Sequence, residues 1–189
     1  DENAEGLKEH AQTLDAVYRT FRDRGFADDD IYYLREVSDR LPGPGSDIVV
    51  DDTTPTKAEI QWAITTWAGQ RKGPLYVVFV DHGGEEAFYT YSGSYDASRS
   101  INPAELDGWF DTYETERASS NDAVKKTVFV YGGCRSGSFI PKLSEAGRVL
   151  VTSASPQESS HRGVIPPGQT VRDGELFVTE LFRGLKLGW

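Results

Sequence analysis

One cysteine and one histidine carry the clearest chemical signal in the sequence. Cys134, the single cysteine of the chain, lies in the glycine-rich run Gly132–Gly137, and His82 is followed directly by Gly83 and Gly84. A thiol that meets an imidazole becomes a nucleophile with its own general base. Glycines let a substrate approach the backbone closely, and consecutive backbone N–H groups there receive an oxyanion. These residue types therefore predict acyl transfer with Cys134 as the nucleophile.

Two apolar runs explain how residues 134 − 82 = 52 positions apart come together. His82 follows the run Leu75–Val80 and Cys134 follows the run Val128–Tyr131. Both runs are continuous and rich in β-branched and aromatic residues, which is typical of strands buried on both faces. Ligands of open α/β sheets bind at the carboxyl ends of such strands. Because neighbouring strands lie about 4.8 Å apart, adjacent placement of these two brings the imidazole close to the thiol.

The remaining periodicity completes an α/β pattern. Four segments have apolar residues at helical spacing, and further short runs are strand-like. The predicted helices cover residues 7–21, begin at Thr54-Pro55 and at Asn102-Pro103, and cover residues 176–185; the further predicted strands are residues 31–34, 88–91 and 148–152. Strands that alternate with helices in this order predict a mainly parallel sheet flanked by helices.

The composition limits the class of protein. With 38% hydrophobic and 26% charged residues, the chain has the profile of one compact soluble domain, which we place at residues 1–189. A net charge of −10 argues against binding to nucleic acid or to an anionic membrane. No run reaches the roughly 18 apolar residues of a membrane span, and the given chain carries no targeting segment. A chain that begins with Asp1 and has no methionine is expected to be excised from a longer polypeptide.

Three motifs, in this order, resemble those of one peptidase family. They are Val78–Gly83 with Asp-His-Gly, Cys134–Ser138 with Cys-Arg-Ser-Gly-Ser, and Val151–Ser160 with Pro-Gln-Glu-Ser-Ser. The set resembles the legumain-like cysteine endopeptidases, family C13 of the caspase-like clan CD, over most of the chain. A histidine about 50 residues before the cysteine is also typical of caspase-like enzymes. The resemblance implies a caspase-like three-layer α/β/α sandwich and hydrolysis of peptide bonds through an acyl-enzyme thioester.

The resemblance also implies roles for the residues at the strand ends. His82 is the expected general acid/base, Cys134 the nucleophile, and the amides of Gly83 and Cys134 the oxyanion hole. Asp81 takes a position that borders the site in the family; the alternative is that its carboxylate only caps the strand end. The implied partner is a polypeptide substrate, and no cofactor is expected.

The specificity pocket departs from the family pattern. In legumain an Arg-His pair, a glutamate two residues before the cysteine, a serine and an aspartate form the S1 pocket. The corresponding positions here are Glu9, His10, Gly132, Ser159 and Glu175. The exchanges at Glu9 and Gly132 leave carboxylates without an obvious cation. A carboxylate without a cation attracts a cationic side chain, so we predict a lysine or arginine at P1 rather than asparagine. The alternative is that Glu9 faces solvent on an amphipathic helix.

The sequence does not indicate a metal site. The three histidines and the cysteine lack the spacing of zinc ligands. The acidic runs Asp28–Asp30 and Asp47–Asp52 leave calcium open as a ligand, but there is no Asp-x-Asp-x-Asp-Gly loop. Solvated faces explain these runs equally well.

Alternatives to a peptidase remain open at this point. The departures at Glu9 and Gly132 also fit a catalytically silent peptide-binding or regulatory module of the same fold, and the same Cys-His dyad serves transpeptidases and ligases. The sheet of the family begins with an apolar strand, which Asp1–Gly6 is too polar to form. We therefore expect that strand in an upstream segment or in a separately processed chain, with its absence as the alternative. Other domains or a processed segment of the same polypeptide are further candidate partners.

Overall fold

The computed structural model describes residues 2–35, 47–53, 55–90, 98–119, 126–165, 167, 172 and 174–188. Contacts divide these residues into two compact units. Unit 1 contains the described residues up to Pro55 and from His161 onward, and unit 2 contains those from Thr56 to Ser160. None of the described helices is long and apolar enough to cross a membrane. The expected single domain and its missing first strand stay predictions.

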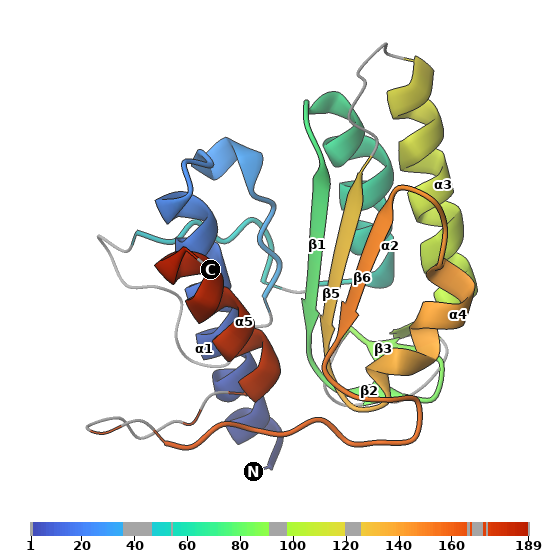
Figure 1. Cartoon of the computed structure of the whole chain (residues 1–189). Coiled ribbons are helices and arrows are strands. Elements are labelled where there is room, and N and C mark those ends of the chain that lie inside the picture. The colour runs from blue at the N-terminus through green and yellow to red at the C-terminus, as the bar shows by residue number, and fades with distance from the viewer. Residues whose placement is uncertain are drawn as a thin grey trace. The chain divides into compact units, whose positions relative to one another are not determined.

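A parallel sheet of three strands forms the centre of unit 2. Strand β1 (Leu75–Val80) pairs with β5 (Thr127–Gly132), which pairs with β6 (Arg148–Thr152), in the order β1-β5-β6 (Figure 1). The register sets Val80 opposite Gly132. All three strands lie where the apolar runs predict them. The central strand β5 is largely buried, as expected for a strand covered on both faces, whereas Tyr76 of β1 and Val149 of β6 are exposed. The predicted α/β class with a mainly parallel sheet is confirmed.

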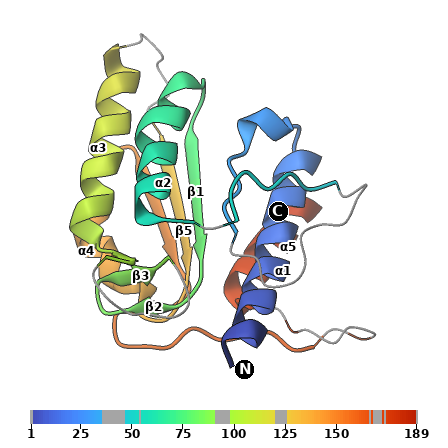
Figure 2. The same ribbon diagram turned by 180° about the vertical axis from the view of Figure 1, so that it is seen from behind.

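Helices of unit 2 run along one face of this sheet (Figure 2). Helix α2 (Lys57–Trp62) continues through the π-helical turn η2 (Ala63–Trp67) and the short helix η3 (Ala68–Gln70), and it packs against α3 (Pro103–Ser119). The Asn102 side chain caps α3 as predicted, since its Oδ1 accepts the amide of Glu105 at 2.9 Å. Phe110 of α3 packs on Phe129 of β5 with ring centroids 5.9 Å apart. Burial of each such ring contributes about 1.5–3 kcal/mol.

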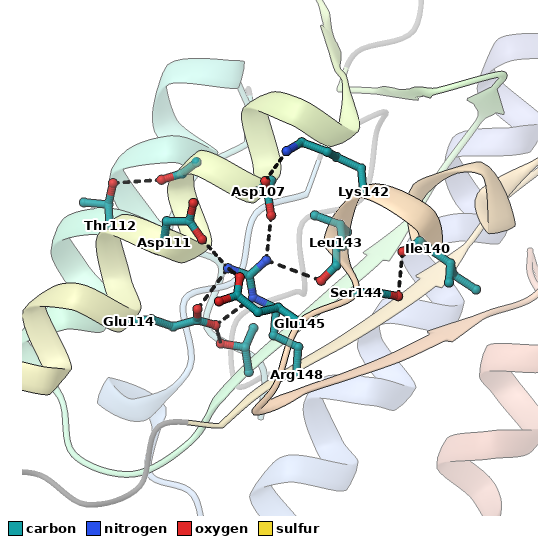
Figure 3. A network of polar contacts seen from close by, with 12 residues as sticks. Asp107, Asp111, Thr112, Glu114, Ile140, Lys142, Leu143, Ser144, Glu145 and Arg148 are labelled. Carbon is teal, nitrogen blue, oxygen red and sulfur yellow. Dashed lines mark hydrogen bonds and ion pairs between the residues drawn. The ribbon is translucent and has the colours of Figure 1, made fainter.

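A network of ion pairs connects the first residue of β6 to α3 (Figure 3). The Arg148 side chain is fully buried, and its guanidinium donates to Asp107 at 2.7 Å, to Asp111 at 2.5 Å and to Glu114 at 2.9 Å. It also donates to the carbonyl of Leu143 in the short helix α4 (Ile140–Leu143), 3.3 Å away. Several carboxylates surround one cation, so the charge of Arg148 is compensated without water.

A small antiparallel sheet follows β1. Its strands are β2 (Gly83–Gly84), β3 (Ala87–Tyr89) and β4 (Ser100–Ile101), and it lies near the carboxyl ends of the parallel strands (Figure 1). The predicted hairpin strand at 88–91 corresponds to β3. Phe88 stacks on Phe79 of β1 at 4.3 Å between centroids, so the hairpin shares the apolar core of the sheet.

Unit 1 is built on helices α1 (Glu2–Asp23) and α5 (Leu176–Leu187), which pack against each other. Gly25 follows α1 with a positive φ of 95°, as predicted for a glycine that ends a helix. The predicted strand at 31–34 is wrong: among the described residues, this segment forms an isolated parallel bridge between Leu34 and Asp52 and no strand. The helix start predicted at Thr54-Pro55 is displaced, because Thr56 caps α2 by accepting the amide of Glu59 at 3.1 Å.

Candidate active site

The ends of β1 and β5 bring the predicted dyad into one corner of unit 2. Because Val80 is opposite Gly132, the segments Asp81-His82 and Gly133-Cys134 leave the sheet next to each other. The amide of Asp81 still donates to the carbonyl of Gly132 at 3.3 Å, which extends the strand pairing by one residue. The prediction that the two strands are neighbours is confirmed, and the backbone register is what places the histidine beside the cysteine segment.

Glycines allow the two segments to touch through their backbones. A Cβ atom on Gly133 would lie 2.8 Å from the carbonyl oxygen of Asp81, which is closer than real Cβ contacts. A Cβ atom on Gly83 would collide with the carbonyl oxygen of Cys134 and with the hydroxyl of Tyr131. The residues on both sides of His82 therefore contact the turn that carries Cys134, and only glycine permits this approach.

The hairpin geometry turns the Gly83 amide away from its partner strand. The amide of Tyr89 donates to the carbonyl of His82 at 3.1 Å. Hydrogen-bonded and non-hydrogen-bonded pairs alternate along an antiparallel ladder, so the next pair, Gly83 with Phe88, is a non-hydrogen-bonded one. The Cys134 amide likewise donates to no acceptor among the described residues. An oxyanion hole needs two such backbone N–H groups near the reacting thiol, so the assignment of the Gly83 and Cys134 amides to it stays a prediction.

The turn after Cys134 is held by the segment that follows β6. Arg135 adopts a left-handed conformation with a φ of 56°, which is uncommon for a residue with a side chain. Its amide donates to the carbonyl of Glu158 at 2.8 Å, and the amide of Gly137 donates to that of Ala154 at 2.9 Å. In the same segment, Ser160 Oγ lies 3.7 Å from Cys134 Sγ. The segment after β6 thus holds the turn that carries Cys134 through two backbone hydrogen bonds and the contact of Ser160 with the sulfur.

In unit 1, three of the predicted pocket residues lie together. Glu9 and His10 are buried on α1, and Glu175 is buried directly before α5. Gly174 joins them: its amide donates to the carbonyl of Glu9 at 3.2 Å, and a Cβ atom there would lie 2.6 Å from the His10 amide nitrogen. Glu175 Oε2 accepts the amide of Val178 at 2.8 Å and so caps α5. The close contact of two backbones brings these residues together.

Comparison of the sequence with models of known families identifies the family to which the chain belongs. The family model described as Peptidase C13 family matches residues 65–182. The chain belongs to the Peptidase C13 family. The matched residues include the whole parallel sheet, His82 and Cys134, and they point to a cysteine peptidase. No curated protein matches the chain.

The charge predicted for the C13 specificity pocket needs a correction at Glu9. Its carboxylate forms ion pairs with Arg162 Nη1 and Arg172 Nε, each at 3.3 Å. The Glu9 residue is 0% exposed, so the alternative that it faces solvent is also wrong. The premise of a carboxylate without a cation therefore fails, because two arginines from a distant segment supply the positive charge.

The other predicted residues lie in unit 2. Gly132 is buried at the end of β5, and Ser159 is exposed in the segment after β6. Asp81 Oδ1 accepts the amide of His82 at 2.6 Å at the end of β1. Its place at the border of the site stays a prediction. Four neighbours of the predicted site were not singled out from the sequence, namely Tyr131, Ser160, Arg162 and Arg172. Only Ser160, adjacent to Ser159 in the Glu-Ser-Ser motif, was within reach of a sequence signal.

The acidic runs considered for calcium make contacts with protein groups. Asp28 pairs with Arg22 at 3.1 Å, Asp47 pairs with Arg19 at 3.0 Å, and Asp51 accepts the amide of Tyr33 at 2.7 Å. Within the described ranges, carboxylates gather at ligand spacing elsewhere, at Asp107, Asp111 and Glu145, where the Arg148 guanidinium contacts all three. Calcium binding stays a prediction.

Proposed function

We propose that this C13 chain is an endopeptidase that cleaves polypeptides through Cys134 and His82. The observation that carries the proposal is the contact of both neighbours of His82 with the turn that bears Cys134. Asp81 meets Gly133 and Gly83 meets Cys134 through their backbones, which supports a placement of the His82 imidazole next to the thiol. A nucleophile, a base and two amides for an oxyanion are then within one corner.

The chemistry follows from these groups. His82 takes the proton of the Cys134 thiol, and the sulfur forms a bond to the carbonyl carbon of the scissile peptide. The carbonyl electrons move to the oxygen, which accepts hydrogen bonds from the amides of Gly83 and Cys134. Collapse of this intermediate breaks the C–N bond, and His82 gives its proton to the leaving amine. Water then attacks the thioester, His82 takes the water proton, and the sulfur leaves and is protonated again.

The ion pairs of Glu9 with Arg162 and Arg172 change the P1 residue that we propose for the substrate. The resemblance assigns Glu9 to the S1 pocket, where a lysine or arginine of the substrate would have to displace Arg162 or Arg172. Each of these two guanidiniums pairs with Glu9 at 3.3 Å, and a guanidinium has five N–H donors, more than one carboxylate oxygen requires. Such donors match an amide or carboxylate oxygen. We therefore favour asparagine or aspartate at P1, with a basic P1 residue as the alternative outcome of profiling.

Covalent labelling tests the proposed function. A peptidyl acyloxymethyl ketone is expected to label the wild-type chain at Cys134 under reducing conditions, and the same preparation is expected to cleave denatured casein. Cys134→Ala removes labelling and cleavage, and His82→Ala reduces both by several orders of magnitude. Arg135→Ala, next to the nucleophile, serves as the folded control and retains labelling.

Three outcomes separate the alternatives. No labelling of a folded wild-type chain contradicts the proposal and favours the silent peptide-binding module. Labelling without hydrolysis, but with transfer of the acyl group to an added amine, favours the transpeptidase or ligase. Cleavage that persists in Cys134→Ala contradicts the dyad.

A further inference from the structure

Tyr131 is the buried aromatic side chain closest in sequence to the candidate nucleophile among the described residues. It lies three residues before Cys134 on β5 and is 0% exposed. Its ring meets Phe88 of β3 edge-on at 5.4 Å between centroids and Phe139 at 5.1 Å. The ring therefore joins the hairpin and the residues after the nucleophile to a single apolar cluster.

The hydroxyl of Tyr131 reaches the hairpin that carries Gly83. It donates to the carbonyl oxygen of Ala87 at 3.1 Å, across 44 residues of sequence. The same hydroxyl also lies against Gly83, where it occupies the space that a Cβ atom would need. The ring carbon Cε2 lies 2.7 Å from the Cβ position of Gly133. One side chain thus touches both backbone segments that supply the oxyanion amides.

The environment keeps this hydroxyl protonated. Burial raises the pKa of Tyr131 well above its usual value, and the charges of Asp81, Cys134 and Tyr89 raise it further. These three are the titratable groups that act on it, from the end of β1, the nucleophile turn and β3. The phenol therefore remains a hydrogen-bond donor to Ala87 near neutral pH.

We propose that Tyr131 is a positioning residue that fixes the Gly83 amide relative to Cys134. The inference rests on the proposed function, because it assigns the Gly83 amide to the oxyanion hole. Without the hydroxyl the ring still packs, but the hairpin loses its hydrogen-bonded anchor on β5. Displacement of an oxyanion donor by about 1 Å costs about a hundredfold in rate. Substrate binding away from the carbonyl oxygen is unaffected.

Tyr131→Phe tests this role, and Tyr113→Phe is its matched control. Tyr113 is also a buried tyrosine of unit 2, and its hydroxyl donates to the carbonyl of Gly73 at 3.3 Å, away from the predicted site residues. Both variants lose one buried hydroxyl, so similar losses of thermal stability are expected. We expect Tyr131→Phe to lower kcat about ten- to hundredfold with KM changed less than about threefold. Tyr113→Phe retains the wild-type kcat.

A second readout separates positioning from simple destabilisation. A peptide aldehyde with the preferred P1 residue forms a thiohemiacetal whose oxygen needs the oxyanion amides, whereas iodoacetamide alkylates the thiol without them. Tyr131→Phe is expected to weaken aldehyde binding by the same factor as kcat and to leave the alkylation rate unchanged. Equal kcat and equal aldehyde affinity in Tyr131→Phe and Tyr113→Phe overturn the inference while Cys134-dependent cleavage stands. A wild-type chain without Cys134-dependent cleavage overturns both.

Discussion

The Cys134 corner of unit 2 and the Glu9 cluster of unit 1 are assembled by different forces. In the corner, strand register and glycine contacts fix the backbone, as between Gly83 and Cys134. In the cluster, a buried carboxylate on α1 is held by two half-exposed arginines, Arg162 and Arg172. Backbone hydrogen bonds and packing are only weakly sensitive to salt, whereas ion pairs with exposed partners are screened by it. The segments that carry the reacting groups are therefore held by backbone contacts, whereas the charges proposed to select the substrate respond to salt.

The largest effect is expected where the backbone contact is tightest. Gly83→Ala adds a methyl group against the Cys134 carbonyl and the Tyr131 hydroxyl, so the hairpin must move. Loss of one oxyanion donor costs about 10²–10³ in kcat, measured by steady-state cleavage of a fluorogenic peptide. Gly84→Ala is the control, because its added methyl meets only the end of the Tyr89 side chain, 2.8 Å from the hydroxyl. If the two variants have equal kcat, rigid backbone placement of the oxyanion amide is not needed.

A medium effect is expected from the cluster in unit 1. Glu9→Gln removes the charge that pairs with Arg162 and Arg172 at 3.3 Å. A charged group that loses its buried counter-charge costs about 1–3 kcal/mol before the arginines gain hydration. We expect a net loss of about 1–3 kcal/mol in unfolding free energy, together with a changed P1 profile. Iodoacetamide labelling of Cys134 stays at the wild-type rate. The measurements are urea denaturation and positional scanning of peptide substrates.

Glu180→Gln provides the matched control for that change. Glu180 pairs with Arg183 on α5 at 3.2 Å, and both side chains are exposed. Exposed pairs contribute about 0–1 kcal/mol, so this variant keeps its stability and its P1 profile. A P1 profile that is the same in Glu9→Gln and in wild type contradicts the assignment of Glu9 to substrate selection.

The smallest effect is expected at Ser160, whose hydroxyl contacts the sulfur of Cys134. Ser160 Oγ lies 3.7 Å from Cys134 Sγ and is placed to donate a weak hydrogen bond to the thiolate. Ser160→Ala is expected to lower the rate of alkylation by iodoacetamide about threefold, since a weak hydrogen bond contributes about 0.5–1 kcal/mol. Ser159→Ala, at the neighbouring exposed serine, leaves that rate unchanged. Equal rates for the two variants show that the contact with Ser160 does not assist the thiolate.

Sequence patterns were sufficient for the corner because its geometry follows from local rules. Continuous apolar runs predicted β1, β5 and β6. Because β1 ends just before His82 and β5 just before Cys134, few topologies of a parallel sheet keep these two residues apart. The hairpin and the cap at Asn102 also follow from nearby residues. The strand predicted at 31–34 does not form, because the described part of this segment makes an isolated bridge between Leu34 and Asp52 instead of a ladder.

The contacts missed from the sequence all depend on side chains that meet only after folding. The pairing of Glu9 with Arg172 spans 163 residues and has no local signal. Tyr131 is an ordinary strand residue by its pattern, and only the tertiary fold shows its hydroxyl on Ala87. Charge counted along the sequence therefore gave the wrong environment for Glu9, whereas strand periodicity gave the right one for Cys134.

Trapping of the acyl-enzyme tests the dyad most directly. The chain is mixed with a peptide ester carrying the preferred P1 residue, quenched in acid within milliseconds to seconds, and its intact mass and digest are measured. The account predicts a mass increase equal to the acyl group, on the peptide that contains Cys134, absent in Cys134→Ala and much reduced in His82→Ala. Turnover of the ester without any adduct on Cys134, and at the same rate in Cys134→Ala, would contradict it.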